Sequence, residues 1–253
     1  MIDLHCHILP GVDDGPTSQD ESLAMARIAV EDGIHAVVAT PHTLNGIYSN
    51  PLREVISKVA TLQKSLSENH IDLLLYVGAD VHLCPHLVDM ITSGDAPTIN
   101  DAGNFILLEL PSQTIPKKGV KDEIFALKLN GITPIITHPE RNAIIQHDPE
   151  ILYEFISMGA LSQVTAMSLT GDFGMRVKHS TEILLKHRLA QIIASDAHSS
   201  GNRPPVLSRA VENAAEILGN NEEAERMVTE VPSAIVSGEM PDIPEPTRAK
   251  GIE

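Results

Sequence analysis

Short aliphatic runs alternate with longer helical patterns along nearly the whole chain, and this alternation constrains the fold more than any other feature of the sequence. It is typical of repeated β-α units, which build a parallel sheet covered by helices. Several runs, such as FILLEL and QIIAS, are continuously apolar, as expected of strands buried on both faces. Seven strands are predicted: Ile2 to His5, Ala36 to Thr40, Leu73 to Val77, Phe105 to Leu110, Pro134 to Thr137, Leu161 to Thr165 and Gln191 to Ser195.

Helix-start patterns lie between these runs. Ser18 and Glu21 form a capping-box pattern at the start of one helix, and Gly33 follows its predicted end. Two other helices are predicted to begin with an N-cap residue and a proline, and these pairs are Asn50 with Pro51 and Asp148 with Pro149. Further helices are predicted near residues 121–129, 181–187 and 205–218.

An alternating chain of 253 residues is predicted to be an α/β protein that closes into a TIM-like (β/α) barrel, made irregular by having seven strands. An open doubly wound sheet is the alternative. The sequence has no visible internal repeat and no interdomain linker, so residues 1–238 are predicted to form a single domain. The acidic, proline-containing tail, residues 239–253, has little apolar content and is expected to be loosely attached.

Charge and hydropathy exclude several classes of partner. The 18 basic and 34 acidic residues give a net charge of −16, which disfavours binding to nucleic acid. No apolar run approaches the roughly 20 residues of a membrane span, and the first residues lack a signal-peptide pattern, so we expect a cytoplasmic protein without membrane insertion. Cys6 and Cys84 are expected to be free thiols. Helix faces rich in Ala and Leu leave open whether the chain forms a homo-oligomer.

Barrel active sites lie at the carboxyl ends of the strands, so the residues that follow each predicted strand are informative. Six of the seven strands deliver a His or a carboxylate there, whereas the sixth, which ends QVTAMS, offers neither. A single strand-end Asp often caps a helix, and a single His is often a surface residue. The inference of a functional site therefore depends on finding such residues at six strand ends. The candidates are His5, His7, Asp14, His42, Asp80, Glu109, His138, Asp196 and His198.

Imidazole nitrogen and carboxylate oxygen are ligands of Zn, Mn and Fe(II). Five His and four carboxylates exceed what one ion with an open position requires, so two or three metal ions that share carboxylates are inferred. Asp13 competes with Asp14, and strand alternation places His82 on the same face as Asp80, so His82 is a spare ligand. His86 is undecided. The histidines predicted to be solvated are His35, His70, His147, His179 and His187.

Two arginines fall on the same predicted rim. Arg141 follows His138 by three residues in HPER, and Arg203 lies in NRPP. Because guanidinium matches phosphate geometry bidentately, both are predicted to contact a phosphate, with surface ion pairing as the alternative.

A cysteine nucleophile is not supported. Cysteine-dependent phosphatases carry an Arg six residues after the nucleophile, and those positions are Val12 after Cys6 and Met90 after Cys84. The sequence also has no GxxxxGK[ST] and no GxSxG motif, so neither P-loop nucleotide use nor the α/β-hydrolase mechanism is indicated.

The ordered set HxH, TPH, GAD, LLELP, HPER and SDAH resembles the PHP (polymerase and histidinol phosphatase) superfamily. More narrowly, MIDLHCHILPGVDDG, ITPIITHPERN and ASDAHSSGNRPP resemble the bacterial manganese-dependent protein-tyrosine phosphatases of the CpsB/CapC type, over about residues 1–238. The resemblance favours Asp14 over Asp13. In one departure, Asp80 stands where the family usually has Glu, so the shorter side chain leaves the number of metal ions open.

The resemblance implies a distorted seven-stranded barrel with a trinuclear site, in which Mn is the expected ion and Fe, Mg and Zn are alternatives. It also implies hydrolysis of phosphotyrosine on a tyrosine autokinase that controls capsule or exopolysaccharide synthesis. For such a substrate, the loop from Thr43 to Asn50 is expected to border a shallow rim. The alternatives are a small-molecule phosphatase, such as a histidinol phosphatase, and a non-enzymatic metal-binding interaction module.

Overall fold

All seven predicted strands are present in the computed structural model, which describes residues 1–249. The protein is a mixed α/β fold in which every strand pair is parallel. The strands that correspond to the predicted ones are β1 (Ile2–Cys6), β2 (Ala36–Ala39), β4 (Leu74–Val77), β6 (Phe105–Glu109), β7 (Thr133–Thr137), β8 (Leu161–Thr165) and β9 (Ile192–Ala194). Two short strands were not predicted, β3 (His42–Thr43) and β5 (Asp80–His82).

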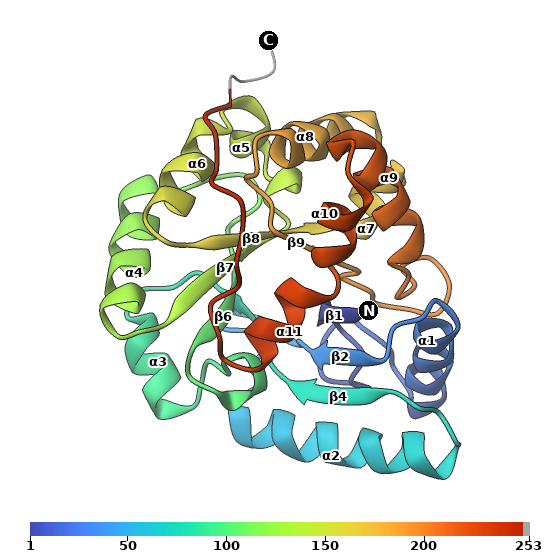
Figure 1. Cartoon of the computed structure of the whole chain (residues 1–253). Helices are drawn as coiled ribbons and strands as arrows, with labels where there is room; N and C mark the ends of the chain where they lie inside the picture. Colours follow the sequence, from blue (N-terminus) through green and yellow to red (C-terminus); the bar gives the residue numbers. More distant parts are fainter. Residues whose placement is uncertain (250–253) are drawn as a thin grey trace.

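The strands form two sheets, with the orders β1-β2-β4 and β3-β5-β6-β7-β8-β9. Within the described residues these sheets do not close into one continuous seven-stranded ring, so this detail of the predicted barrel is not confirmed. An isolated parallel bridge between Cys6 and Ala197 joins the first sheet to the segment after β9. Figure 1 shows the strands at the centre of the molecule with helices around them.

The sheets divide directly after two of the predicted strands, Ala36 to Thr40 and Leu73 to Val77. Pro41 lies between β2 and β3 and has no N–H group for strand pairing. Gly78 lies between β4 and β5, and a Cβ atom there would come within 2.6 Å of a methyl carbon of Val38. The short strands β3 and β5 then pair with each other, which brings His42 opposite Asp80.

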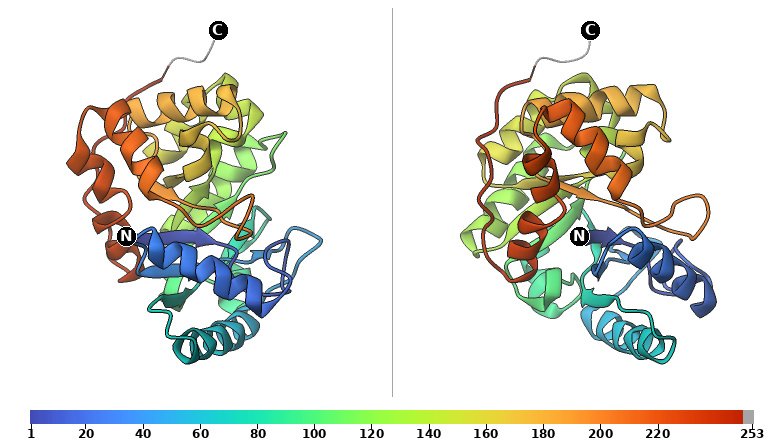
Figure 2. Two further views of the ribbon diagram at one scale, coloured as in Figure 1. Left: turned by 90° about the vertical axis from the view of Figure 1, so that its right-hand side faces the viewer. Right: turned by 45° about the vertical axis from the view of Figure 1, so that its right-hand side comes forward.

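The apolar interior between the strands is closed at the end where the strands begin. Leu4, Val38, Leu107 and Ile135 lie in one buried cluster with residues of α11 (Glu230–Val236). Figure 2 shows the N-terminus and the last described segment on one side of the molecule, and the long loops after β1 and β9 on the opposite side. The carboxyl ends of the strands, where the loops begin, are therefore the open end.

The helix starts were predicted only in part. Ser18 caps α1 (Gln19–Glu31) by accepting from the Glu21 N–H, as predicted, but the Glu21 carboxylate accepts from Ser200 instead of completing the capping box. Gly33 has a φ of +87° just beyond the end of this helix, in agreement with its predicted role.

Both predicted N-cap and proline pairs were wrong by one position, because Pro51 and Pro149 themselves occupy the N-cap positions. They precede α2 (Leu52–Glu68) and α6 (Glu150–Ser157). The Asn50 amide instead donates to the carbonyls of Val12 and His42, a tertiary contact that local pattern does not predict.

The helices predicted near 121–129, 181–187 and 205–218 are present with different starts, and the shorter helices were not predicted. The first three are α4 (Lys117–Leu129), α8 (Met175–Lys186) and α9 (Ser208–Leu218). The others are α3 (Leu87–Ser93), α5 (Ala143–His147), α7 (Ala166–Thr170), α10 (Asn221–Arg226) and the 3₁₀ turns η1 (Ile99–Asp101) and η2 (Pro139–Arg141). Among the described helices, none combines the length and apolarity that a membrane crossing needs.

The segment 239–249 contains no helix or strand but contacts the body of the protein. The Thr247 N–H donates to the His187 carbonyl at 2.8 Å. Arg248 pairs with Glu150 at 2.5 Å and lies over the Tyr153 ring at 5.1 Å. The remainder of the predicted loose tail, 250–253, lies outside the described residues, and the division at residue 238 stays a prediction.

Candidate metal centre

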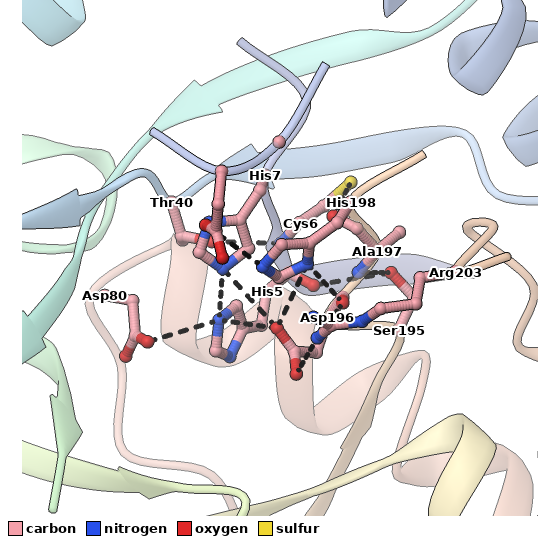
Figure 3. Close-up of polar contacts among 12 residues, drawn as sticks. His5, Cys6, His7, Thr40, Asp80, Ser195, Asp196, Ala197, His198 and Arg203 are labelled. Carbon is pink, nitrogen blue, oxygen red and sulfur yellow. Dashed lines mark hydrogen bonds and ion pairs between the residues drawn. The ribbon is translucent and has the colours of Figure 1, made fainter. Parts of the chain in front are cut away.

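The nine predicted ligands come together at the open end of the strands. Figure 3 shows several of these side chains, including His5, His7 and Asp196, directed toward one another. Three groups have candidate ligand atoms that all lie within 4.8 Å of one another: His7 with Asp14, His42 and His198; His5 with His7 and Asp196; and His42 with Asp80 and Glu109. His138 lies beside the third group, with Nε2 3.8 Å from Glu109 Oε1.

Two of these residues are held in the left-handed region of backbone conformation. His138 has a φ of +36° and Asp196 a φ of +51°. For residues other than glycine this costs about 1–3 kcal/mol each, and His138 is restricted further because Pro139 follows it. The Asp196 N–H donates to the His5 carbonyl at 2.8 Å, so a backbone hydrogen bond between segments holds the turn after β9.

Three imidazoles share one arrangement. Nδ1 of His5 lies 2.9 Å from Gln163 Oε1, Nδ1 of His7 lies 2.7 Å from Asp13 Oδ2, and Nδ1 of His198 lies 2.9 Å from the Asp196 carbonyl oxygen. In a neutral imidazole, an oxygen acceptor at Nδ1 fixes the tautomer in which Nε2 carries the lone pair. The Nε2 atoms of His5 and His7 lie at hydrogen-bond distance from each other, 3.1 Å. Imidazoles that bind a metal ion are commonly oriented in this way.

The structure separates the two competing aspartates. Asp13 accepts from His7, from the Gly15 N–H and from the His42 N–H, so its carboxylate is occupied by hydrogen bonds. Asp14 is 51% exposed, and its Oδ1 lies 3.6 Å from His42 Nε2 and 3.5 Å from His198 Nε2. This geometry favours Asp14 as the ligand and Asp13 as the residue that orients His7.

The electrostatics fit a site for cations. Burial opposes protonation of His7, but the carboxylates of Asp13 and Asp196 raise the pKa of His7 to about 10, so a proton is held among them. Despite burial, His5 and the other nearby imidazoles hold the pKa values of Asp80 and Asp196 below their usual range. The carboxylates are therefore charged at neutral pH.

Two other imidazoles are held neutral. Burial, followed by the positive charge of Arg141, lowers the pKa of His138 to about 4. Burial and the positive charge of His7 lower the pKa of His198 to about 2. Neutral imidazole is the form that binds a metal ion.

Two buried polar atoms at the centre of the site provide an independent test of fit. His42 Nδ1 and Asp80 Oδ2 lie 3.2 Å apart, and neither has a hydrogen-bond partner among the described residues. A buried polar atom without a partner costs about 1–3 kcal/mol, and a divalent ion held by these residues would remove that cost. The donor set and these two atoms together fit a metal centre.

The remaining histidines fall outside the three groups. His82 lies 3.2 Å from Glu109 Oε2, so it contacts a predicted ligand. His86 is exposed and precedes α3. Of the five histidines predicted to be solvated, His187 differs because it is half-buried against Thr247. The four exposed ones are His35, His70, His147 and His179.

Arg141 and Arg203 both reach the predicted rim. Arg141 Nη1 and Arg203 Nη2 donate to the same oxygen of Asp196, Oδ2, at 2.5 and 2.6 Å. Arg141 also borders a cavity of about 140 Å³ whose lining includes Glu109, Ser112 and His138. The site therefore places two guanidinium groups beside the candidate metal ligands and next to a cavity.

Glu140, a fully buried residue between His138 and Arg141, was not predicted to be a functional residue. Its Oε1 accepts from the Thr165 N–H at 2.9 Å and from Ser168 Oγ at 2.6 Å, and burial raises the pKa of Glu140. β8 was predicted to offer no ligand, but its Thr165 anchors the turn that carries Arg141. Gln163 of the same strand orients His5. HPER contains no local signal for this role, because the partners lie far along the chain.

Glu140→Ala is expected to lower the free energy of unfolding by about 1–3 kcal/mol, because it leaves the Thr165 N–H and the Ser168 hydroxyl without their acceptor. Urea unfolding monitored by circular dichroism measures this. Glu140→Gln retains an amide oxygen at the same position and is the matched control. Equal loss of stability in both variants would contradict the anchoring role of the Oε1 hydrogen bonds.

The fold and the site define a parallel α/β protein with a candidate metal centre at the carboxyl ends of its strands. The chain belongs to the CpsB/CapC family, described as capsular polysaccharide synthesis, CpsB/CapC, which matches residues 1–237. The resemblance seen in the sequence motifs is therefore confirmed.

Relatives in the family are named tyrosine phosphatases. The chain is 38% identical over 209 residues to the putative tyrosine-protein phosphatase CapC of Staphylococcus aureus, covering 83% of this chain and 81% of the relative. It is 37% identical over 203 residues to the tyrosine-protein phosphatase YwqE of Bacillus subtilis, covering 80% and 79%. A solved structure also matches, from work on YwqE of Bacillus subtilis and CpsB of Streptococcus pneumoniae, described as unique metal-dependent tyrosine phosphatases. The TM-score is 0.94 at 33% sequence identity, and the match covers 99% of this chain and 100% of that chain.

Proposed function

We propose that this chain is a metal-dependent protein-tyrosine phosphatase. One observation carries the proposal: a His and carboxylate cluster and two arginines meet on one rim, in a chain that matches metal-dependent tyrosine phosphatases over nearly its whole length. In this proposal the chain hydrolyses a phosphomonoester, and the phosphate leaves a tyrosine side chain.

The nine predicted ligands hold two or three divalent ions in this proposal, and Mn²⁺ is the proposed ion. Imidazole and carboxylate suit Mn²⁺, Fe²⁺, Mg²⁺ and Zn²⁺ to different degrees, so the chain itself does not select one ion. Asp80 Oδ2 lies 3.2 Å from His42 Nδ1, which supports a ligand role for Asp80 despite its short side chain. When bound, such ions lower the pKa of water to about 7 and neutralise phosphoryl oxygens.

The residues of the chain then bind and orient the phosphate. Arg141 and Arg203 present guanidinium N–H groups to a single carboxylate oxygen of Asp196, and phosphoryl oxygens accept the same hydrogen bonds. His5, His7 and His198 keep their Nδ1 atoms on oxygen acceptors, so that their Nε2 atoms stay directed to the centre.

Arg141→Lys is expected to lower kcat/KM for a phosphotyrosine peptide by about 10- to 100-fold, because a lysine ammonium cannot reproduce the planar pair of donors. The initial rate of phosphate release measures it. Arg53→Lys, on the exposed face of α2, is the control and should leave kcat/KM unchanged. An Arg141→Lys enzyme with wild-type kcat/KM would exclude phosphate contact by Arg141.

The proposed substrate is the phosphotyrosine-containing tail of a bacterial tyrosine kinase that controls capsule or exopolysaccharide synthesis. The 43–50 loop supports an open rim: Ile47 is 81% exposed, and the Tyr48 ring lies parallel to the His42 ring at 6.3 Å. A cytoplasmic location belongs to the same proposal, and Cys6 and Cys84 are free thiols, as is usual in reducing compartments. The barrel is proposed to be the distorted seven-stranded one, which the bridge from Cys6 to Ala197 supports.

A substrate panel tests the proposal against its alternatives. Chelator-treated protein is supplied with Mn²⁺, Mg²⁺, Zn²⁺ or no metal and assayed on a phosphotyrosine peptide, a phosphoserine peptide and histidinol phosphate. We expect metal-restored release of phosphate with the highest kcat/KM on phosphotyrosine. Activity on histidinol phosphate alone would favour the metabolic phosphatase, and silence on all three with metal bound would favour the non-enzymatic module.

A further inference from the structure

Phe173 lies against the two arginines of the candidate site. Its ring centre is 5.0 Å from Arg141 Cζ and 5.9 Å from Arg203 Cζ, with both guanidinium groups over the ring. It belongs to the connection between α7 and α8, which follows β8, the strand predicted to offer no ligand. The chain has only four Phe and no Trp, so an aromatic ring at this point is unusual in this sequence.

The local backbone places Phe173 in a tight turn. Gly171 and Gly174 stand on either side of the Asp172–Phe173 pair with φ values of +90° and +93°, a conformation that side chains other than glycine rarely adopt. The Asp172 N–H donates to the Met167 carbonyl at 3.0 Å, and the Gly174 N–H donates to the Gly171 carbonyl at 2.9 Å. Phe173 therefore sits at the tip of a tight, hydrogen-bonded turn.

The two arginines need more than one stabilising partner. Both guanidinium groups carry a full positive charge and both donate to the same oxygen of Asp196. Under the proposed function the Asp196 carboxylate is also a metal ligand, so its single negative charge is shared. The face of an aromatic ring attracts cations and stacks with planar guanidinium, and it does not compete with a phosphate for the N–H donors.

We propose that Phe173 is a positioning residue that holds Arg141 and Arg203 side by side for the phosphoryl group of a phosphate monoester. This inference rests on the proposed function, since it concerns the same site. The ring face attracts both guanidinium groups and accepts none of the N–H hydrogen bonds that now go to Asp196 and that phosphoryl oxygens would accept. The β8–α8 segment thus contributes to phosphate binding through side chains that are not metal ligands.

The kinetic test separates positioning from a structural role. Phe173→Leu is expected to raise KM for a phosphotyrosine peptide, and the inhibition constant of inorganic phosphate, by about 3- to 10-fold, since cation–π contacts contribute on this scale. The value of kcat should change less than about twofold, because ground state and transition state lose the same contact. Phe173→Tyr keeps the ring and should restore KM. Wild-type KM together with a wild-type inhibition constant for phosphate in Phe173→Leu, whatever the value of kcat, would overturn the proposal.

A second readout does not depend on activity. In chelator-treated protein labelled with ¹⁵N-arginine, the Nε–Hε signals of Arg141 and Arg203 are assigned with Arg141→Lys and Arg203→Lys. Both signals are expected to move in Phe173→Leu, because the ring current is lost, and to stay in place in Phe125→Leu, which alters an exposed ring on α4. Unchanged signals in Phe173→Leu would overturn the proposal. A wild-type protein without phosphotyrosine turnover would contradict the proposed function, and these signals would still decide the positioning.

Discussion

Asp196→Asn is expected to lower kcat/KM for a phosphotyrosine peptide by at least about 100-fold, since replacing even the outer contacts of a metal ligand costs about 10- to 100-fold. Asp196 Oδ1 lies 3.4 Å from the Nε2 atoms of both His5 and His7, and Oδ2 accepts from Arg141 and Arg203. The amide retains the shape of the side chain but removes its charge. The amide NH₂ group also points its N–H donors either at the two arginines or at the two imidazoles.

Initial rates with saturating Mn²⁺ measure this effect, and metal content is measured on the same samples. Asp72→Asn changes an exposed aspartate outside the site and is the charge-matched control, expected to keep wild-type kcat/KM. An Asp196→Asn enzyme that keeps more than about a tenth of the wild-type kcat/KM would be inconsistent with a ligand role, given the size expected for that role.

Asp3→Ala is expected to lower the free energy of unfolding by about 3 kcal/mol, because three buried donors lose their acceptor. Asp3 is fully buried, and its carboxylate accepts from the Ser195 N–H at 2.9 Å, from Ser195 Oγ at 2.5 Å and from the His5 N–H at 3.3 Å. These bonds join β1 to the segment after β9, close to the isolated bridge between the two sheets.

Urea unfolding in the presence of chelator isolates this effect from metal binding. Asp3→Asn retains one oxygen acceptor for the backbone N–H groups and should lose about 1 kcal/mol, the scale of a single hydrogen bond. If Asp3→Ala were as stable as the wild type, the contact between the first and last strands would not depend on this carboxylate.

The strands were predictable from the sequence because each buried strand is a continuous apolar run with turn residues around it. The short strands β3 and β5, which follow the second and third predicted strands, were not predictable, since the constraint at Gly78 that separates β4 from β5 comes from the Val38 side chain across the sheet. The starts of α2 and α6 were predicted one residue early. For α2, the Asn50 side chain has tertiary partners that a local cap pattern does not reveal.

The candidate ligands were predictable because parallel strands end at one rim, so position in the chain implies proximity in space. The residues that orient them were not. Gln163 contacts His5 from 158 positions away, and Phe173 lies against two arginines that belong to different segments of the chain. Such side chains follow no periodic pattern, and only the folded chain brings them to the site.

Metal content and turnover measured together provide the most direct test of the metal-dependent mechanism. Chelator-treated protein is titrated with Mn²⁺, and bound metal and phosphate release from a phosphotyrosine peptide are determined on the same samples. We expect turnover to rise in step with bound Mn²⁺ until two or three ions are held per chain, with little turnover before metal is added. Full turnover by protein shown to hold no metal, or metal binding without any turnover, would contradict the metal-dependent mechanism.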